Sequence, residues 1–190
     1  MLDFNPVREK RITLNDLAGE LTKQDLKELT ISMIGAQQEL IVNCSDADVI
    51  LVPEDPLADD PFADRLKDVS LAWTLGHVIV HVTASSEEAA AIAGELARGV
   101  SYHGRSRYET PWQSVTTIEQ CRERLGESEK IRLASLEMWP NLPHLDNGYK
   151  SRPGAPAMNA TTRFIYGLMH DDDHLEQISK IVHQAQHARS

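Results

Sequence analysis

Cysteine is scarce in this chain of 190 residues, and its two cysteines, Cys44 and Cys121, lie far apart in the sequence. This spacing excludes a disulfide framework and the paired cysteines of a zinc ribbon. A reducing cytoplasm is therefore the expected compartment, and both thiols are expected to pack as small core groups.

Long hydrophobic runs are also absent. No window reaches the roughly 18 apolar residues that a membrane-spanning helix needs, and no apolar run follows the charged N-terminus, MLDFNPVREKR. We therefore expect neither insertion into a membrane nor export through a signal peptide.

Basic residues are outnumbered, because 19 lysines and arginines stand against 29 aspartates and glutamates, with a formal net charge of -10. This balance opposes sequence-independent attraction to the phosphate backbone of nucleic acid or to anionic lipid. Nucleic acid is therefore not an expected partner.

The chain instead has four long segments whose apolar residues recur at helical spacing. The pattern predicts helices over residues 22–43, 69–98 and 116–139, and a fourth helix that begins at Asn159 or Thr161. Signals for β-hairpins are sparse. These features predict an all-α protein built as a four-helix bundle.

Long connections separate the predicted helices. Prolines and acids fill residues 45–68, and prolines and glycines recur over residues 140–156. With 41% hydrophobic residues, the chain can bury one sizeable core. We therefore expect an N-terminal lead-in over residues 1–21 and a single bundle domain with long inter-helix connections over residues 22–190.

Two histidines, His170 and His174, lie four residues apart in the last predicted helix. Residues at this spacing project from one helix face and can bind one metal ion together. Helical steps through this pair reach apolar residues on both sides, so we expect both imidazoles to face the core. The pair then needs a further ligand from another part of the chain.

The same spacing occurs twice more, at His77/His81 and at His183/His187. His77 and His81 lie in the most apolar part of the second predicted helix. They can be core imidazoles satisfied by hydrogen bonds, or part of a metal or proton-transfer site. The spacing by itself leaves both possibilities open.

The connection over residues 99–115 carries Arg105, Arg107 and Tyr108 in an otherwise acidic chain. Guanidinium groups pair bidentately with carboxylates, so this segment can bind an anionic substrate. It can equally be a packed connection held by salt bridges, and we favour this second interpretation.

The stretch from Trp73 to His81, together with the pair His170/His174, resembles the DinB-like superfamily. These metal-binding four-helix-bundle proteins include the YfiT-like proteins and thiol-dependent transferases. In that family a tryptophan near the start of the second helix is followed eight residues later by a histidine, and a His-x-x-x-His motif lies in the last helix. The resemblance covers residues 22–187 and implies His81, His170 and His174 as metal ligands.

His77 departs from the family pattern, because members often have an acidic or neutral residue at that position. It lies one helical turn from His81. We therefore consider His77 a candidate fourth ligand, a proton shuttle or a packed neighbour of the site.

Three neutral imidazoles leave a divalent ion with positions open for a substrate atom, as in catalytic sites. The resemblance implies a metal-dependent enzyme of the thiol S-transferase type, with a low-molecular-weight thiol as co-substrate and a small molecule as substrate. Zinc is the default ion, and nickel or iron also suits imidazole ligands. The family likeness also implies a homodimer.

Two alternatives stay open. The chain can be a non-catalytic metal-binding stress or interaction protein, in which the ion holds two helices together. It can also be a metal-dependent hydrolase, in which Asp171 or Asp173 orients a water molecule that the metal activates.

Overall fold

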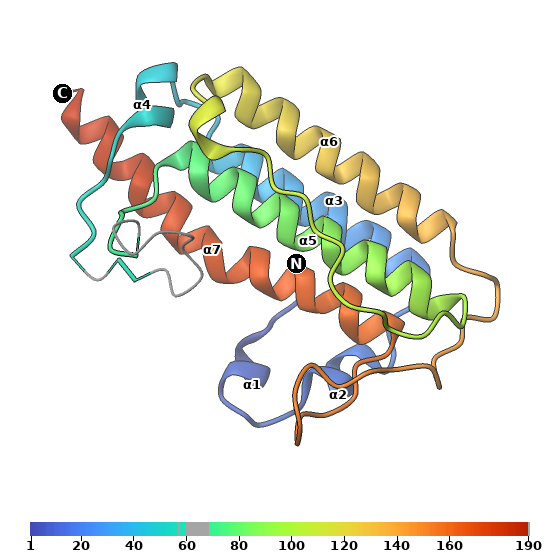
Figure 1. Cartoon of the computed structure of the whole chain (residues 1–190). Helices are drawn as coiled ribbons and strands as arrows, with labels where there is room; N and C mark the ends of the chain where they lie inside the picture. The colour runs from blue at the N-terminus through green and yellow to red at the C-terminus, as the bar shows by residue number, and fades with distance from the viewer. Residues whose placement is uncertain (57, 60–68, 190) are drawn as a thin grey trace.

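The long helices of the chain pack side by side (Figure 1). The structure is a computed structural model that describes residues 1–56, 58–59 and 69–189, and these residues form seven α-helices and no strand. The prediction of an all-α fold is therefore confirmed. The four long helices are α3 (Lys23–Leu40), α5 (Leu75–Ala97), α6 (Ile118–Glu137) and α7 (Ala160–Ala188).

Each long helix packs against two others. Helix α5 contacts α7 most extensively and then α6, whereas α3 contacts both α6 and α7. Ser86 of α5 lies beside Gly167 of α7, and His81 lies beside His170. The residue numbers rise along one helix as they fall along the other, so α5 and α7 run in opposite directions.

Side-chain caps confirm three of the predicted helix starts. Thr22 and Asp25 form a reciprocal capping box at the start of α3, and Thr117 and Gln120 form another at α6. Asn159 caps α7. Each cap satisfies backbone N–H groups that the first helical turn leaves without an intrahelical partner.

Helix α5 begins at Leu75, later than the predicted start at residue 69. Leu71 and Leu75 keep helical spacing, and for this reason the predicted helix begins too early in the chain. Thr74 is extended (φ -68°, ψ 166°), and its hydroxyl accepts the backbone N–H of His77 at 3.2 Å. A threonine that caps in this way starts the helix at its own position. Trp73 therefore lies just before the helix.

The lead-in over residues 1–21 forms two short helices, α1 (Asn5–Arg8) and α2 (Leu14–Ala18). Helix α2 packs against α7. The side chain of Phe4 is buried and belongs to the same core cluster as residues of α7. The lead-in is therefore packed onto the helices that follow it.

The connections are less uniform than predicted. The connection over residues 45–68 begins with a short helix, α4 (Asp46–Ile50), which a capping box starts and which the density of prolines and acids concealed. The prediction for this connection also covers residue 57 and residues 60–68, which lie outside the described residues. The connection between α5 and α6 contains a 3₁₀ turn, η2 (Trp112–Ser114).

Helices α5 and α7 approach each other closely at Gly167. A Cβ atom at this position would lie 2.7 Å from Ala89 Cβ and 3.2 Å from Ser86 Cα. Only a hydrogen atom fits there, so the glycine permits the close approach of the two helices. The side chains that flank this crossing are thereby brought within reach of each other.

Apolar side chains fill the interior in two clusters, one around Phe164 and the other around Ile79. Cys44 and Cys121 are both buried, as predicted, and both belong to the second cluster. No described helix is long and apolar enough to cross a membrane.

Candidate metal centre

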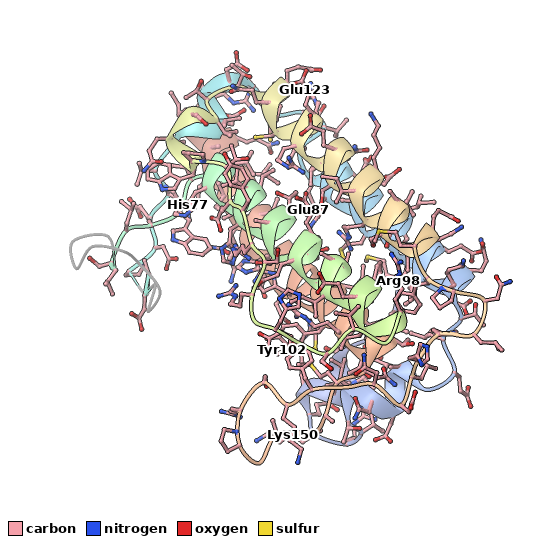
Figure 2. The ribbon with its side chains drawn as sticks, turned by 45° about the vertical axis from the view of Figure 1, so that its right-hand side comes forward. His77, Glu87, Arg98, Tyr102, Glu123 and Lys150 are labelled. Carbon is pink, nitrogen blue, oxygen red and sulfur yellow. The ribbon has the colours of Figure 1, made fainter. Side chains whose placement is uncertain are left out.

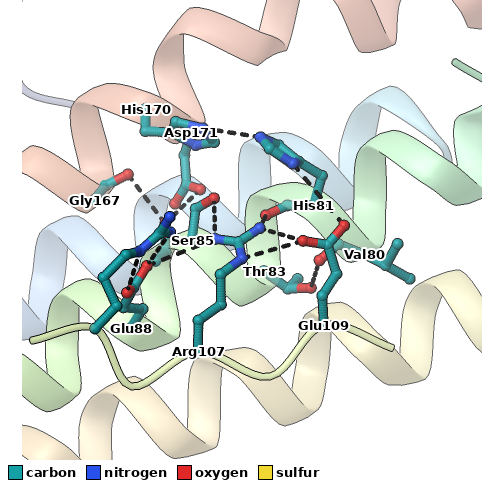
Figure 3. Close-up of polar contacts among 12 residues, drawn as sticks. Val80, His81, Thr83, Ser85, Glu88, Arg107, Glu109, Gly167, His170 and Asp171 are labelled. Carbon is teal, nitrogen blue, oxygen red and sulfur yellow. Dashed lines mark hydrogen bonds and ion pairs between the residues drawn. The ribbon is translucent and has the colours of Figure 1, made fainter. Parts of the chain in front are cut away.

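Three histidines from two helices converge at the α5–α7 interface. His81 projects from α5, and His170 and His174 project from α7, with one ligand atom of each lying within 4.8 Å of the others. The Nε2 atoms of His81 and His170 are 3.1 Å apart (Figure 3). The structure therefore brings together the three histidines that the family resemblance implied.

The donor set fits a divalent metal ion. Two imidazole nitrogens on one tetrahedral ion, each about 2.0–2.1 Å from it, lie roughly 3.3 Å apart. The separation of 3.1 Å between His81 Nε2 and His170 Nε2 is close to that value. His174 Nδ1 lies 2.6 Å from Gln177 Oε1, so the proton of this ring is held at Nδ1 and the lone pair is left at Nε2.

Burial keeps two of the imidazoles neutral. Burial, together with the neighbouring His170, His174 and Arg107, lowers the pKa of His81 to about 2. Burial likewise lowers the pKa of His170 to about 4, with His174 and Arg107 contributing. A neutral imidazole offers a lone pair to a metal ion without first losing a proton.

The connection between α5 and α6 lies along α5 and supports His81. Arg107 donates hydrogen bonds to Ser85 Oγ at 2.7 Å and to the carbonyl oxygen of His81 at 3.4 Å, and it is ion-paired with Glu109 (Figure 3). Glu109 Oε1 in turn lies 4.0 Å from His81 Nδ1. Arg107 and Glu109 therefore place one charge of each sign beside the imidazole.

Arg105 and Tyr108 have different environments. Arg105 makes a bidentate ion pair with Glu88 of α5, through hydrogen bonds of 2.8 Å and 2.7 Å. The Arg105–Glu88 and Arg107–Glu109 pairs are salt bridges of the kind that the favoured interpretation expects, and a substrate-binding role of the segment stays a prediction. Tyr108 is 79% exposed and does not line the cleft described below.

His77 lies near the three-histidine cluster but outside it. Its ring is stacked between two indoles, with centroids 4.4 Å from Trp73 and 4.8 Å from Trp112. Trp73 also contacts the rings of His81 and His174. His77 is thus held in an aromatic stack. His81, and not His77, is grouped with the two histidines of α7.

Asp171 and Asp173 make their hydrogen bonds and ion pairs with side chains other than the three clustered imidazoles. Asp171 is fully buried, where it accepts a hydrogen bond from Arg132 of α6 at 2.8 Å and one from Ser86 at 2.6 Å. Asp173 is paired with Arg8 of the lead-in at 2.6 Å. Adjacent helical positions point about 100° apart, so residues next to a ligand face other neighbours. A role for either aspartate in supporting the metal ligands therefore stays a prediction.

A large cleft runs along the side of α5 that carries the histidines. Its volume is about 1230 Å³, and all three clustered histidines and His77 line it. Figure 2 shows His77 towards one end of α5 and Tyr102, which also lines the cleft, towards the other. The aromatic residues of the lining are Trp73, Tyr102, Trp112, Tyr149 and Tyr166.

Sequence reasoning missed several polar residues of this region. Ser86 and Glu88 interrupt the apolar pattern of α5, yet both are buried, at 2% and 3% exposed. Arg163, 7% exposed, also lines the cleft and received no role from the sequence. The sequence feature that could have identified these residues is their position among apolar residues of long helices, because a polar side chain buried there needs a partner.

Comparisons of the chain with protein-family models, with curated proteins and with solved structures find no match. The DinB-like resemblance therefore stays a prediction that rests on the tryptophan and histidine spacing.

Proposed function

We propose that this chain is a DinB-like protein of the four-helix-bundle type that binds a divalent metal ion through His81, His170 and His174 and catalyses a thiol transfer. The observation that carries this proposal is the convergence of the three imidazoles on the wall of a cleft of about 1230 Å³. A site of this kind offers an ion three protein ligands and leaves space for a fourth from solution.

The chemistry follows from the donor set. A divalent ion at this site supplies Lewis acidity, which lowers the pKa of a coordinated thiol or water. The protein's own residues hold and orient the ligands, since Gln177 binds His174 Nδ1 and Glu109 lies 4.0 Å from His81 Nδ1. Zinc is the default ion, and nickel or iron also suits three imidazoles.

The position of the site favours catalysis over a purely structural role. The His81 side chain is 24% exposed, and His170 and His174 also line the cleft. A structural ion is normally enclosed by four protein ligands, whereas this cluster offers three and faces open space. A small molecule can therefore approach the ligand atoms.

The nucleophilic thiol is expected to come from solution. Cys44 and Cys121 are both buried, and burial raises the pKa of the Cys121 thiol to about 12. A thiol with such a pKa forms almost no thiolate near neutral pH. This supports a low-molecular-weight thiol as co-substrate and not a cysteine of the chain.

The test is conjugation of monochlorobimane to a panel of thiols (glutathione, bacillithiol and mycothiol) by protein loaded with zinc, nickel or iron. We expect conjugation with at least one thiol, and its loss after removal of the metal or in His174→Ala. His183→Ala, a change at the exposed end of the same helix, is the matched control and should keep the activity.

The alternatives give different results in the same samples. A protein that binds metal but conjugates none of the thiols would be a non-catalytic metal-binding protein. Metal-dependent hydrolysis of nitrophenyl esters without thiol conjugation would favour the hydrolase, although Asp171 is paired with Arg132 and Asp173 with Arg8.

A further inference from the structure

Arg163 lies in the first turn of α7 and lines the same cleft as the histidines. It is 7% exposed, and its Nε atom is buried without a hydrogen-bond partner. Its guanidinium carbon lies 5.2 Å from the centroid of the Tyr166 ring, which is a cation–π contact. Arg163 makes no ion pair with any residue that the structure describes.

The other two arginines of the cleft differ from Arg163, because each already has a carboxylate partner. Arg105 binds both oxygens of Glu88, and Arg107 is paired with Glu109. The carboxylates that line this part of the cleft are therefore engaged. Arg163 is left without a carboxylate within ion-pair distance among the described residues.

A buried, unpaired guanidinium is unfavourable in the free protein. Removing a charge from water is costly unless a partner of opposite sign replaces the lost hydration. The position adds to this penalty, because the N-terminal turn of a helix carries a partial positive charge that repels a cation and attracts an anion. Arg163 and the start of α7 together form a positive site that is open to the cleft.

Aromatic rings surround this site. Tyr102 and Tyr149 are stacked with their ring centroids 3.9 Å apart, and both line the cleft along with Tyr166. Tyr149 is held in place by two backbone hydrogen bonds to Met158, of 3.1 Å and 2.8 Å, just before α7 begins. These rings provide flat apolar surfaces beside the cation.

We infer that Arg163 binds the carboxylate of a small, planar organic acid, whose body lies against the tyrosines and extends along the cleft towards the histidines. Such an acid is the substrate class of the proposed function. The role of the acid as a substrate rests on the proposed function, whereas the binding of the acid to Arg163 does not. The planar guanidinium matches a carboxylate with two parallel hydrogen bonds.

The spacing along α7 sets the size of the ligand. Arg163 and His170 are separated by two helical turns, so a bound carboxylate lies roughly 10 Å along the helix axis from the metal ligands. One aromatic ring with a short substituent spans such a distance. A singly charged anion is favoured over a doubly charged one, because buried Glu88 lies close enough to interact electrostatically with Arg163.

The test uses benzoate as the probe and benzamide as its neutral isostere, with binding measured by isothermal titration calorimetry on the full chain. Benzoate should bind at least about tenfold more tightly than benzamide, as expected for a charge-assisted bidentate pair. Arg163→Gln should lose this preference, and Arg163→Lys should retain only part of it because lysine lacks the planar fork. Arg152→Gln removes the same charge at an exposed position and should change nothing.

Two further measurements distinguish a carboxylate site at Arg163 from a general anion site and from a purely structural arginine. Sulfate, titrated in parallel, should compete weakly, and equal binding of sulfate would overturn the assignment to a carboxylate. The thermal midpoint of Arg163→Gln should equal or exceed that of the wild type, since an unpaired buried charge is removed. A strongly destabilised Arg163→Gln variant would instead assign Arg163 a structural role.

Benzoate binding and metal binding are separable. Arg163→Gln should still take up one equivalent of zinc, because the three histidines are unchanged. Benzoate binding that persists undiminished in Arg163→Gln would overturn the carboxylate site and leave the metal site intact. Absence of zinc uptake in the wild type with normal benzoate binding would overturn the proposed function and leave the anion site intact.

Discussion

His81 Nε2 and His170 Nε2 face each other at 3.1 Å, although 89 residues separate them in the chain. The antiparallel packing of α5 and α7 brings them together, and Gly167 permits the short distance between the two helices. His174 joins them from the next turn of α7. The three imidazoles thus depend on one helix interface, and the first two predictions address this dependence.

Replacing His81 or His170 with alanine should abolish stoichiometric zinc uptake, because two remaining imidazoles bind an ion much more weakly than three. Elemental analysis of protein dialysed against zinc gives the stoichiometry. His183→Ala should keep full uptake, since His183 and His187 form an exposed pair at the same spacing. His77→Ala should also keep full zinc uptake. If His77→Ala lost zinc and His81→Ala kept it, His77 and not His81 would be the third ligand.

Gly167→Ala should weaken both folding and zinc binding. The new methyl group would lie 2.7 Å from Ala89 Cβ, so α5 and α7 must move apart. Overpacking of this kind lowers the free energy of unfolding by about 1–3 kcal/mol. Urea denaturation and zinc titration measure the two effects.

Gly35→Ala is the control for this change. Gly35 lies on an exposed face of α3 and has no atom within 4 Å of a built Cβ. Alanine should therefore raise the free energy of unfolding, by about 0.5–1 kcal/mol, and leave zinc binding unchanged. Equal behaviour of the two variants would show that the α5–α7 approach does not depend on the glycine.

The buried ion pair between Arg132 and Asp171 should be sensitive to the loss of one partner. Both side chains are almost completely buried, and the pair joins α6 to α7 over 2.8 Å. Asp171→Ala leaves the Arg132 charge without a partner, so we expect a loss of about 3–5 kcal/mol in urea denaturation.

Two comparisons identify the cause of that loss. Replacing both partners, with Arg132→Met and Asp171→Leu, should restore much of the stability, because no unpaired charge remains. Glu176→Ala breaks the exposed pair with Lys180 and should cost less than about 1 kcal/mol. A double variant as unstable as Asp171→Ala would attribute the loss to packing instead.

Cys121 should make stability fall at alkaline pH. Burial raises the pKa of its thiol from 9.0 to about 12, so above pH 9 the unfolded chain releases a proton that the folded chain keeps. The unfolded state then binds fewer protons, and the free energy of unfolding decreases as pH rises. Between about pH 8 and about pH 10, this group should remove roughly 1.4 kcal/mol.

The comparison is with Cys121→Ala, measured by urea denaturation at both pH values. This variant has lower stability throughout because of the lost packing, but its alkaline decrease should be smaller than that of the wild type. Parallel decreases in the two proteins would show that other groups cause the alkaline loss. The folded wild type should also resist iodoacetamide, whereas the denatured chain should react at both cysteines.

Local sequence determined the helices and most of their starts. Capping residues such as Thr22, Thr117 and Asn159 act on backbone groups within three residues, so the information is contained in the segment itself. The spacing of His170 and His174 likewise placed both on one helix face. The predicted start of α5 was wrong because the apolar spacing begins before Thr74, the residue that caps the helix.

Only the tertiary structure decided which side chains meet. His81 and His77 have the same chemistry and lie one turn apart, and the packing of α5 on α7 groups His81 with the other two histidines and His77 with two indoles. The same packing turned Asp171 towards Arg132 and left Arg163 without a carboxylate. The sequence of a helix fixes the relative directions of its own side chains. The partners of those side chains depend on how helices distant in the chain cross each other. Contacts such as the one at Gly167 set this crossing.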